Sequence, residues 1–246
     1  MKLKDREILE LIKEHAVFHK KYIEQDCIVS YKDNSKSYYM PLFEFNKMKQ
    51  TIVRPDREKF FESIVKFNEN FINKKVLEIG VADGSNAIRI YNYLKPEKIW
   101  LVDPWISQNN RAADRGSNDK QHNEAYEKTK DKFSNKNCEI IRDFAKNVAD
   151  KFEDEFFDFI YIDGDHSYEG CKIDLDLYYP KLKKGGFFGG HDFTGNWNSL
   201  HNKEYGVQKA VSEFLLEQNK KLQFITLCVE TISPDNILPF DWGFIK

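Results

Sequence analysis

The sequence predicts a doubly wound α/β fold, for three reasons. From residue 74 onward, seven apolar runs of strand length alternate with amphipathic segments of helical length. Strands buried on both faces read as continuous apolar runs, and their alternation with helices indicates parallel neighbours. The last two runs are joined by residues 230–238, which leave no room for a helical crossover and therefore predict an antiparallel final strand.

The expected elements follow in order along the chain. Residues 1–73 are predicted to be a helical extension, with amphipathic helices over 3–19 and 56–71 and an irregular segment over 30–55. This extension is expected either to pack on the main domain or to serve as a lid or dimer contact. Residues 74–246 hold the sheet. Its seven strands are expected at 76–79, 99–102, 139–141, 156–162, 186–188, 224–229 and 240–245, and its helices at 85–94, 124–133, 168–179 and 207–217.

Composition argues against several classes of protein. The 246 residues carry 38 Lys and Arg against 40 Asp and Glu, and the net charge of −2 lacks the basic excess of a nucleic-acid binder. No apolar stretch is long enough to span a membrane, and the charged N-terminus differs from a signal peptide. The four cysteines form no C-x-x-C pair, which predicts reduced thiols in a cytoplasmic protein. We expect a small-molecule partner, no nucleic acid and no membrane, with an extension that could support a homo-oligomer.

A glycine-rich turn follows the first predicted strand. Residues 77–86 read LEIGVADGSN, in which Gly80 and Gly84 permit close backbone approach or a positive φ. The G-x-x-x-G spacing differs from the dinucleotide fingerprint and from a nucleoside-triphosphate P-loop. Glu78 and Asp83 would repel a pyrophosphate. The turn is therefore interpreted as the site of a cofactor with a neutral or cationic group, and not as an ordinary βα turn that binds no ligand.

An acid at the end of the second strand adds to this pattern. Asp103 lies in the stretch LVDPW, about 20 residues after Gly84, where an acid would bind ribose hydroxyls. Together with EIGVADGS, FDFIYIDGDHSYEG and LKKGGFFGGHDF, this stretch resembles class I S-adenosylmethionine (SAM) methyltransferases. The resemblance is to the group with the macrocin-type and cephalosporin-biosynthesis-type O-methyltransferases. It covers about residues 74–230 and implies a Rossmann-like fold.

The resemblance implies roles for single residues. Glu78, Gly80 and Gly84 would surround the methionine part of SAM. Asp103 would bind the ribose, and Asp143 would contact the adenine. The full set of implied cofactor contacts is Glu78, Gly80, Asp83, Gly84, Ser85, Asp103, Trp105, Asp143 and Asp163.

Acids and a histidine follow the fourth and fifth predicted strands. Asp163 and Asp165 end the fourth strand, and His191 and Asp192 end the fifth. Because the carboxyl ends of neighbouring parallel strands line one crevice, these side chains are expected to meet there. Related metal-dependent O-methyltransferases have an acid after strand four and an acidic or amide pair after strand five. Asp163 and Asp192 occupy these positions, so the resemblance implies a catalytic metal site there. His191, which stands where these enzymes often have an acid, completes the expected set of Asp163, His191 and Asp192.

Three interpretations of this cluster stay open. In the first, Mg²⁺ or Mn²⁺ binds Asp163, His191 and Asp192 and lowers the pKa of a substrate hydroxyl. In the second, no metal binds and His191, His166 or Asp163 is the general base. In the third, the groups are structural, and Asp165 and His166 cap the helix that follows.

The predicted function is SAM-dependent O-methylation of a small polar acceptor such as a sugar, a nucleotide-linked sugar or a natural product. The acceptor pocket is expected to be formed by loops 104–123 and 193–205 and by the extension over residues 1–73 (the N-terminal unit). The Asn, Arg and Trp residues of the loops suit a hydroxylated, anionic compound. Two other classes stay open: an NAD-linked oxidoreductase on the same architecture, and a non-catalytic module with a SAM pocket. Methyl transfer to protein or nucleic acid is disfavoured by the near-neutral charge.

Overall fold

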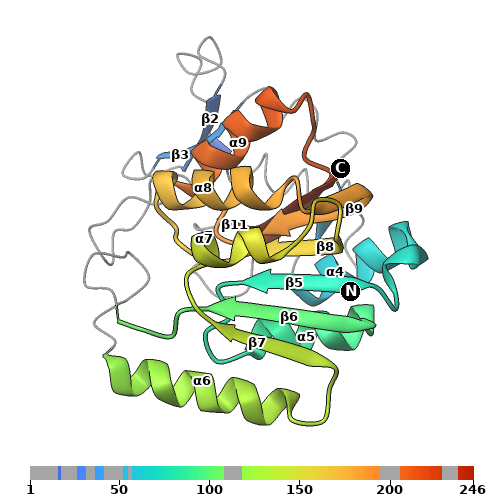
Figure 1. Ribbon diagram of the computed structural model, residues 1–246. Helices are drawn as coiled ribbons and strands as arrows, with labels where there is room; N and C mark the ends of the chain where they lie inside the picture. Colours follow the sequence, from blue (N-terminus) through green and yellow to red (C-terminus); the bar gives the residue numbers. More distant parts are fainter. Residues whose placement is uncertain are drawn as a thin grey trace, which may run out of the picture.

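One mixed sheet forms the centre of the fold (Figure 1). The computed structural model describes residues 16–17, 27–31, 37–41, 52–54, 57–107, 118–193, 206–228 and 238–246. Within these residues the main sheet has eight strands: β4 (Ile52–Arg54), β5 (Lys75–Ile79), β6 (Lys98–Asp103), β7 (Cys138–Arg142), β8 (Phe157–Ile162), β9 (Leu182–Gly190), β10 (Phe224–Cys228) and β11 (Leu238–Ile245). Their order across the sheet is β4-β10-β11-β9-β8-β5-β6-β7.

The parallel part of the sheet is centred on β5. This strand pairs in parallel with β6 on one side and with β8 on the other, and β7 and β9 continue the parallel ladder outward. β11 runs antiparallel to both β9 and β10. The predicted doubly wound sheet with an antiparallel last strand is therefore confirmed. The predicted count of seven strands is not, because β4 pairs in parallel with β10 and adds an eighth strand at the edge.

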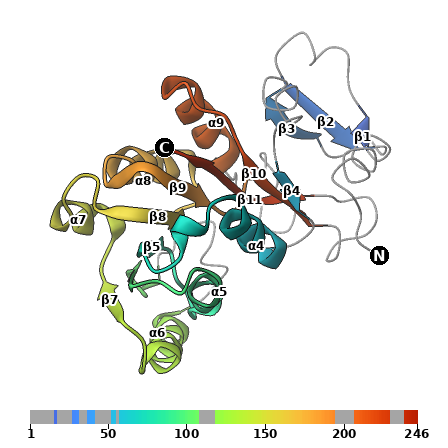
Figure 2. The ribbon, with the colours of Figure 1, turned by 90° about the vertical axis from the view of Figure 1, so that its right-hand side faces the viewer.

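Helices cover both faces of the sheet (Figures 1 and 2). They are α4 (Arg57–Phe67), α5 (Ser85–Leu94), α6 (Asp119–Phe133), α7 (Ala145–Val148), α8 (Tyr168–Tyr178) and α9 (Val207–Glu217). Successive strand residues point to opposite faces. Leu77 and Phe188 accordingly pack under α7, α8 and α9, whereas Val76 and Phe187 pack under α4, α5 and α6. Within the described residues, no helix is long and apolar enough to cross a membrane.

The N-terminal unit is not purely helical. Three short strands, β1 (Ala16–Val17), β2 (Cys27–Tyr31) and β3 (Ser37–Pro41), form a separate antiparallel sheet (Figure 2). The predicted helix over residues 3–19 is wrong at Ala16–Val17, which pair with β2, and its other residues lie outside the described part of the chain. The irregular segment predicted over 30–55 is wrong where β3 and β4 form. The aromatic and β-branched residues of these runs suit strands, but their partners are set by tertiary structure.

Helix α4 confirms the second helix predicted in the N-terminal unit. A 3-10 helix, η2 (Glu69–Phe71), follows it. Phe60 packs edge-on against Phe187, and Phe61 packs against Tyr161, so α4 closes one face of the sheet. The proposed division of the chain at residue 73 stays a prediction, and α4 contributes to the core from the N-terminal side of it.

Candidate active site

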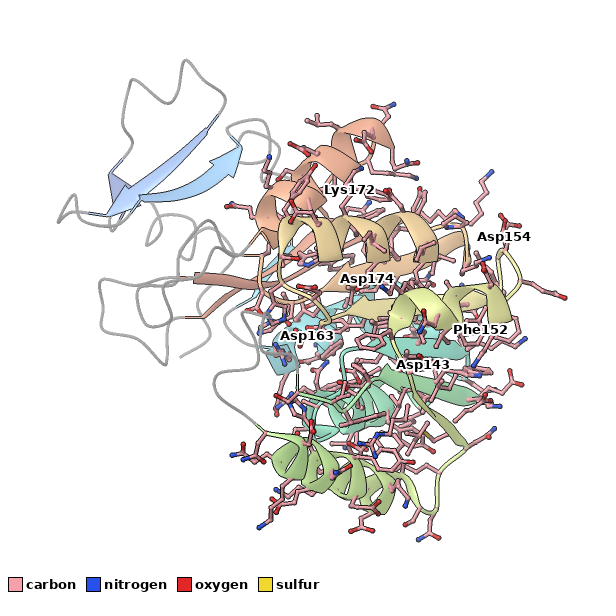
Figure 3. The ribbon with its side chains drawn as sticks, turned by 60° about the vertical axis from the view of Figure 1, so that its left-hand side comes forward. Asp143, Phe152, Asp154, Asp163, Lys172 and Asp174 are labelled. Carbon is pink, nitrogen blue, oxygen red and sulfur yellow. The ribbon has the colours of Figure 1, made fainter. Side chains whose placement is uncertain are left out.

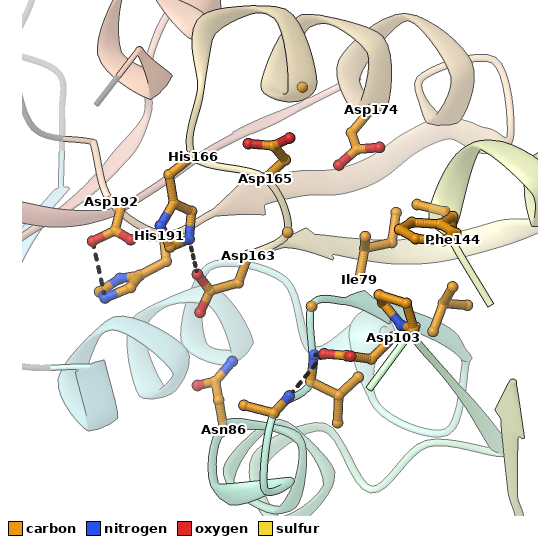
Figure 4. A pocket seen from close by; sticks show the side chains of 18 of the residues that line it. Ile79, Asn86, Asp103, Phe144, Asp163, Asp165, His166, Asp174, His191 and Asp192 are labelled. Carbon is orange, nitrogen blue, oxygen red and sulfur yellow. Dashed lines mark hydrogen bonds and ion pairs between the residues drawn. The ribbon is translucent and has the colours of Figure 1, made fainter. Parts of the chain in front are cut away.

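A cavity of about 920 Å³ lies at the carboxyl ends of β5, β6, β8 and β9 (Figure 4). The chain passes from β5 to β6 and β7 on one side and then returns to β8 and β9 on the other. This reversal is the place where ligands bind in doubly wound folds. The volume falls in the range of sites for small molecules, about 300–1,000 Å³.

The glycine turn packs directly on the end of β8. Gly80 has a φ of +79°, and a Cβ there would lie 1.8 Å from the carbonyl oxygen of Asp163. The N–H of Asp163 in turn donates to the carbonyl of Ile79 at 2.7 Å. Gly84, with a φ of +75°, is the N-cap of α5. The predicted need for glycine at both positions is confirmed.

Asp83 and Ser85 line the cavity as a hydrogen-bonded pair. The Asp83 carboxylate accepts hydrogen bonds from the Ser85 N–H (3.0 Å), the Ser85 hydroxyl (2.9 Å) and Lys132 Nζ (3.2 Å). Burial alone would raise the pKa of Asp83, but the hydrogen bonds from Ser85 and Lys132 lower it below its ordinary value. The turn thus offers an ionised carboxylate to a cationic part of a ligand.

Glu78 lies behind the turn rather than in the cavity. It is fully buried, and its Oε1 accepts a hydrogen bond from Asn86 Nδ2 at 2.8 Å. Burial raises the pKa of Glu78 to about 8, although the Asn86 hydrogen bond opposes the rise. Asn86 itself lines the cavity, so Glu78 reaches the ligand space only through this amide.

Asp103 braces the turn from the end of β6. Its Oδ2 accepts the N–H groups of Val81 (2.8 Å) and Ala82 (3.0 Å), and its Oδ1 accepts the N–H of Trp105 (2.6 Å). Each carboxylate oxygen can accept two hydrogen bonds, so Oδ1 retains an acceptor site for a ligand hydroxyl. Asp103 lines the cavity, which is compatible with the predicted ribose contact.

Besides Glu78 and Gly84, two more implied cofactor contacts lie outside the cavity lining. Trp105 is buried, and its Nε1 donates to the carbonyl of Ala82 at 2.7 Å, so it supports the turn from beneath. Asp143 accepts hydrogen bonds from the Phe144 N–H (2.7 Å) and from Asn147 Nδ2 (2.8 Å) beside α7, away from Asp163 in Figure 3. Phe144 lines the cavity instead. Direct contact of Trp105 or Asp143 with the cofactor stays a prediction.

A cluster of two acids and a histidine lies in the cavity apart from Asp103 (Figure 4). It consists of Asp163, His166 and Asp192. His166 Nε2 lies 3.2 Å from Asp163 Oδ1 and 3.1 Å from Asp192 Oδ2. One donor atom from each of the three residues lies within 4.8 Å of the others, a spacing that could hold a metal ion. Burial alone would lower the pKa of His166, but the two carboxylates raise it to about 9.

His191 lines the same cavity but is turned toward a second carboxylate. Its Nδ1 lies 3.2 Å from Oδ1 of the buried Asp241, and its Nε2 lies 3.7 Å from Asp192 Oδ1. Asp241 Oδ1 also accepts hydrogen bonds from Arg57 Nε (2.9 Å) and from the Tyr161 hydroxyl. Because an ionised carboxylate only accepts, His191 Nδ1 is assigned as the donor to Asp241. Burial alone would lower the pKa of His191, but the carboxylates of Asp192, Asp163 and Asp241 raise it above its ordinary value.

The sequence therefore predicted Asp163 and Asp192 as neighbours but not the histidine between them. The structure groups His166 with these acids, where the predicted metal set has His191. Asp165 and His166 were predicted to cap α8, and this prediction is confirmed only in part. Ser167 is the N-cap, its Oγ accepting the N–H of Gly170, while Asp165 accepts the N–H of Ser167.

The groups around His191 gave no signal in the sequence. Arg57 and Asp241 come from α4 and β11, 184 positions apart. Neither residue lies in a motif, and only the fold brings them together. His166, in contrast, stood within the D-G-D-H stretch and could have been assigned to the site from that pattern.

A family model described as a methyltransferase domain matches residues 77–193, which hold the glycine turn, Asp103 and the acids after β8 and β9. Residues 77–193 form a class I SAM-dependent methyltransferase domain. The family resemblance read from the sequence is confirmed. No curated protein sequence matches the chain.

Two solved structures have the same fold as this methyltransferase. An O-methyltransferase from Bacillus cereus in complex with S-adenosylhomocysteine (SAH) is 13% identical over 97% of this chain and 97% of its own, with a TM-score of 0.51. The 1,6-didemethyltoxoflavin-N1-methyltransferase of Burkholderia thailandensis, with bound 1,6-didemethyltoxoflavin and SAH, is 9% identical over 78% of this chain and 79% of its own, with a TM-score of 0.52. At such identities the likeness shows the fold alone.

We expect Asp103→Ala to weaken binding of SAH by at least about 10-fold, because a charge-assisted hydrogen bond to a ribose hydroxyl is lost. Calorimetric titration measures the affinity, and thermal unfolding verifies that the variant is folded. Asp143→Ala is the companion variant, for which the geometry predicts a smaller effect since Asp143 does not line the cavity. An unchanged affinity in Asp103→Ala would refute the ribose contact.

Asp241→Asn is expected to lower the free energy of unfolding by roughly 2–4 kcal/mol, because three donors lose their ionised acceptor and Arg57 loses its ion-pair partner. Tyr161→Phe removes one neutral donor to the same oxygen and should cost only about 1 kcal/mol. Urea unfolding measures both.

Nitrogen-15 spectra of the His191 ring should show a protonated Nδ1 in the native protein, and an Nε2–H tautomer would contradict the assignment.

Proposed function

We propose that this methyltransferase transfers the SAM methyl group to a hydroxyl oxygen of a small polar acceptor, with a divalent cation held by Asp163 and Asp192. The observation that carries the proposal is the meeting of these carboxylates with His166 in the cavity, beside the glycine turn. Hydroxyl groups need this kind of help, because their protons are weakly acidic. SAM supplies an activated methyl group.

The donor set suits a hard divalent ion. Asp163 and Asp192 provide carboxylate oxygens, which Mg²⁺ prefers, and the His166 nitrogen shifts the preference toward Mn²⁺. When bound, such an ion would lower the pKa of a substrate hydroxyl. His166 between two carboxylates already indicates that this point of the cavity stabilises positive charge.

A metal-independent mechanism is the second candidate, and one observation favours it. His191 has Nδ1 directed to Asp241, so its Nε2 can accept a proton on the cavity side. In either mechanism the hydroxyl proton leaves, and the oxygen electron pair forms the new bond to the methyl carbon as the carbon–sulfur bond breaks. The chain's task is to align these atoms and to receive or release one proton.

The acceptor is proposed to be a sugar, a nucleotide-linked sugar or a natural product, in line with a role in carbohydrate biosynthesis. The loops expected to bind it, 104–123 and 193–205, lie mostly outside the described residues. The near-neutral net charge of −2 supports a small molecule over nucleic acid. A homo-oligomer that uses the N-terminal unit also belongs to this proposal.

Methyl transfer from isotope-labelled SAM tests the proposal directly. The purified chain is incubated with free sugars, nucleotide-linked sugars, a catechol, amines and RNA, with Mn²⁺, with Mg²⁺ and after chelation. We expect label on a hydroxylated small molecule, lost after chelation and restored by a divalent ion. Label only on amines or RNA would contradict the acceptor class. Full transfer after chelation would favour the metal-independent mechanism.

A further inference from the structure

The charges that line the cavity are unbalanced. Its acidic side chains are those of Asp83, Asp103, Asp163, Asp165, Asp174 and Asp192. Among the described lining residues, the lysine and arginine side chains are those of Arg57 and Lys146 alone. A ligand with a sulfonium and an ammonium group is well matched to the acids. His166 is paired with Asp163 and Asp192. A ligand carboxylate in the same cavity is therefore best matched to Arg57 or Lys146.

Arg57 is held with part of its guanidinium available to a ligand. It is the first residue of α4, and its side chain is 22% exposed. Nε donates to Asp241 Oδ1 at 2.9 Å and Nη1 donates to Asn86 Oδ1 at 3.3 Å. A guanidinium has five N–H donors. Within the described residues, three of these donors have no hydrogen-bond partner, and the side chain borders the cavity.

The two cations come from different helices, Arg57 from α4 and Lys146 from α7. Lys146 belongs to α7, after β7, next to Phe144. Arg57 instead contacts Asn86, which lies on the side of Asp163, across the cavity from Asp103 and Phe144 (Figure 4). With the ribose at Asp103, an adenine directed toward Phe144 leaves the amino-acid part of the cofactor on the side of Asn86 and Arg57.

We propose that Arg57 binds the α-carboxylate of the methionine part of SAM, an inference that rests on the use of SAM in the proposed function. The planar guanidinium can donate two parallel N–H groups to a carboxylate, whereas a lysine cannot. Asp241 and Asn86 fix the orientation of the group without using all its donors. A helix of the N-terminal unit thereby completes the cofactor site.

Two ligands that differ in this carboxylate test the inference. SAH carries the amino-acid part, and 5′-methylthioadenosine lacks it. Calorimetry on the full chain should show that Arg57→Gln weakens SAH binding by about 10- to 100-fold, the effect of a charge-assisted hydrogen bond, and changes methylthioadenosine binding by less than about 3-fold. Arg57→Lys should restore only part of the SAH affinity.

Tyr161→Phe is the matched control. It removes another donor to the same Asp241 oxygen but leaves the Arg57 guanidinium intact, so the ratio of the two affinities should not change. A ratio that is also unchanged in both Arg57 variants would overturn the inference while leaving the SAM site itself intact. Failure of the native chain to bind either ligand would overturn the cofactor assignment and the role of Arg57 together.

Discussion

Gly80→Ala is expected to lower the free energy of unfolding by roughly 2–5 kcal/mol, since two costs add. Gly80 has a φ of +79°, where a residue with a Cβ loses about 1–2 kcal/mol. The new Cβ would also lie 1.8 Å from the carbonyl oxygen and 2.2 Å from the carbonyl carbon of Asp163. Both are backbone atoms at the end of β8, so relieving the overlap has to shift the strand, at about 1–3 kcal/mol.

Gly185→Ala separates the two costs. Gly185 has a φ of +80°, but no atom lies within 4 Å of a Cβ built there. Its loss should therefore be only about 1–2 kcal/mol. Equilibrium urea unfolding of both variants gives the free energies. Equal losses at Gly80 and Gly185 would refute the close packing of the glycine turn on β8.

The need for glycine in this turn also explains why the first strand, the turn and the start of α5 could be predicted from the sequence. A buried strand, a turn that needs positive φ and a helix start leave their marks within ten consecutive residues, 77–86. The antiparallel β11 was predictable because loop length limits strand direction. Strands β1 to β4 were not, because their residues form strands only when a partner strand is available, and periodicity does not reveal the partner.

The residues of the candidate site were likewise predictable only in part. Asp103, Asp163 and Asp192 were predictable because each follows a buried strand, and strand ends meet at one edge of the sheet. Arg57 and Asp241 approach from α4 and β11, where no sequence spacing marks them. The D-G-D-H stretch could have placed His166 at the site, but the sequence does not show ring direction. The fold directs His166 Nε2 between Asp163 and Asp192.

We expect Asp163→Asn to weaken binding of Mn²⁺ by at least about 100-fold. Loss of a supporting residue around a metal ligand already costs about 10–100-fold, and loss of a charged ligand should exceed that. Asp165→Asn is the matched control, since Asp165 lines the same cavity but lies outside the group of three. It should change the affinity by only a few fold. Electron paramagnetic resonance of Mn²⁺, with and without SAH, gives these affinities without a known acceptor.

The histidine variants then decide which ring belongs to the ion site. His166→Gln should weaken Mn²⁺ binding by at least about 10-fold, whereas His191→Gln should leave it nearly unchanged, because His191 Nδ1 faces Asp241. The opposite order would restore the ligand set read from the sequence, Asp163, His191 and Asp192. Failure of the native chain to bind Mn²⁺, even with SAH present, would refute the ion site and favour a proton acceptor at His191. SAH binding should persist in both histidine variants, because neither ring contacts the glycine turn or Asp103.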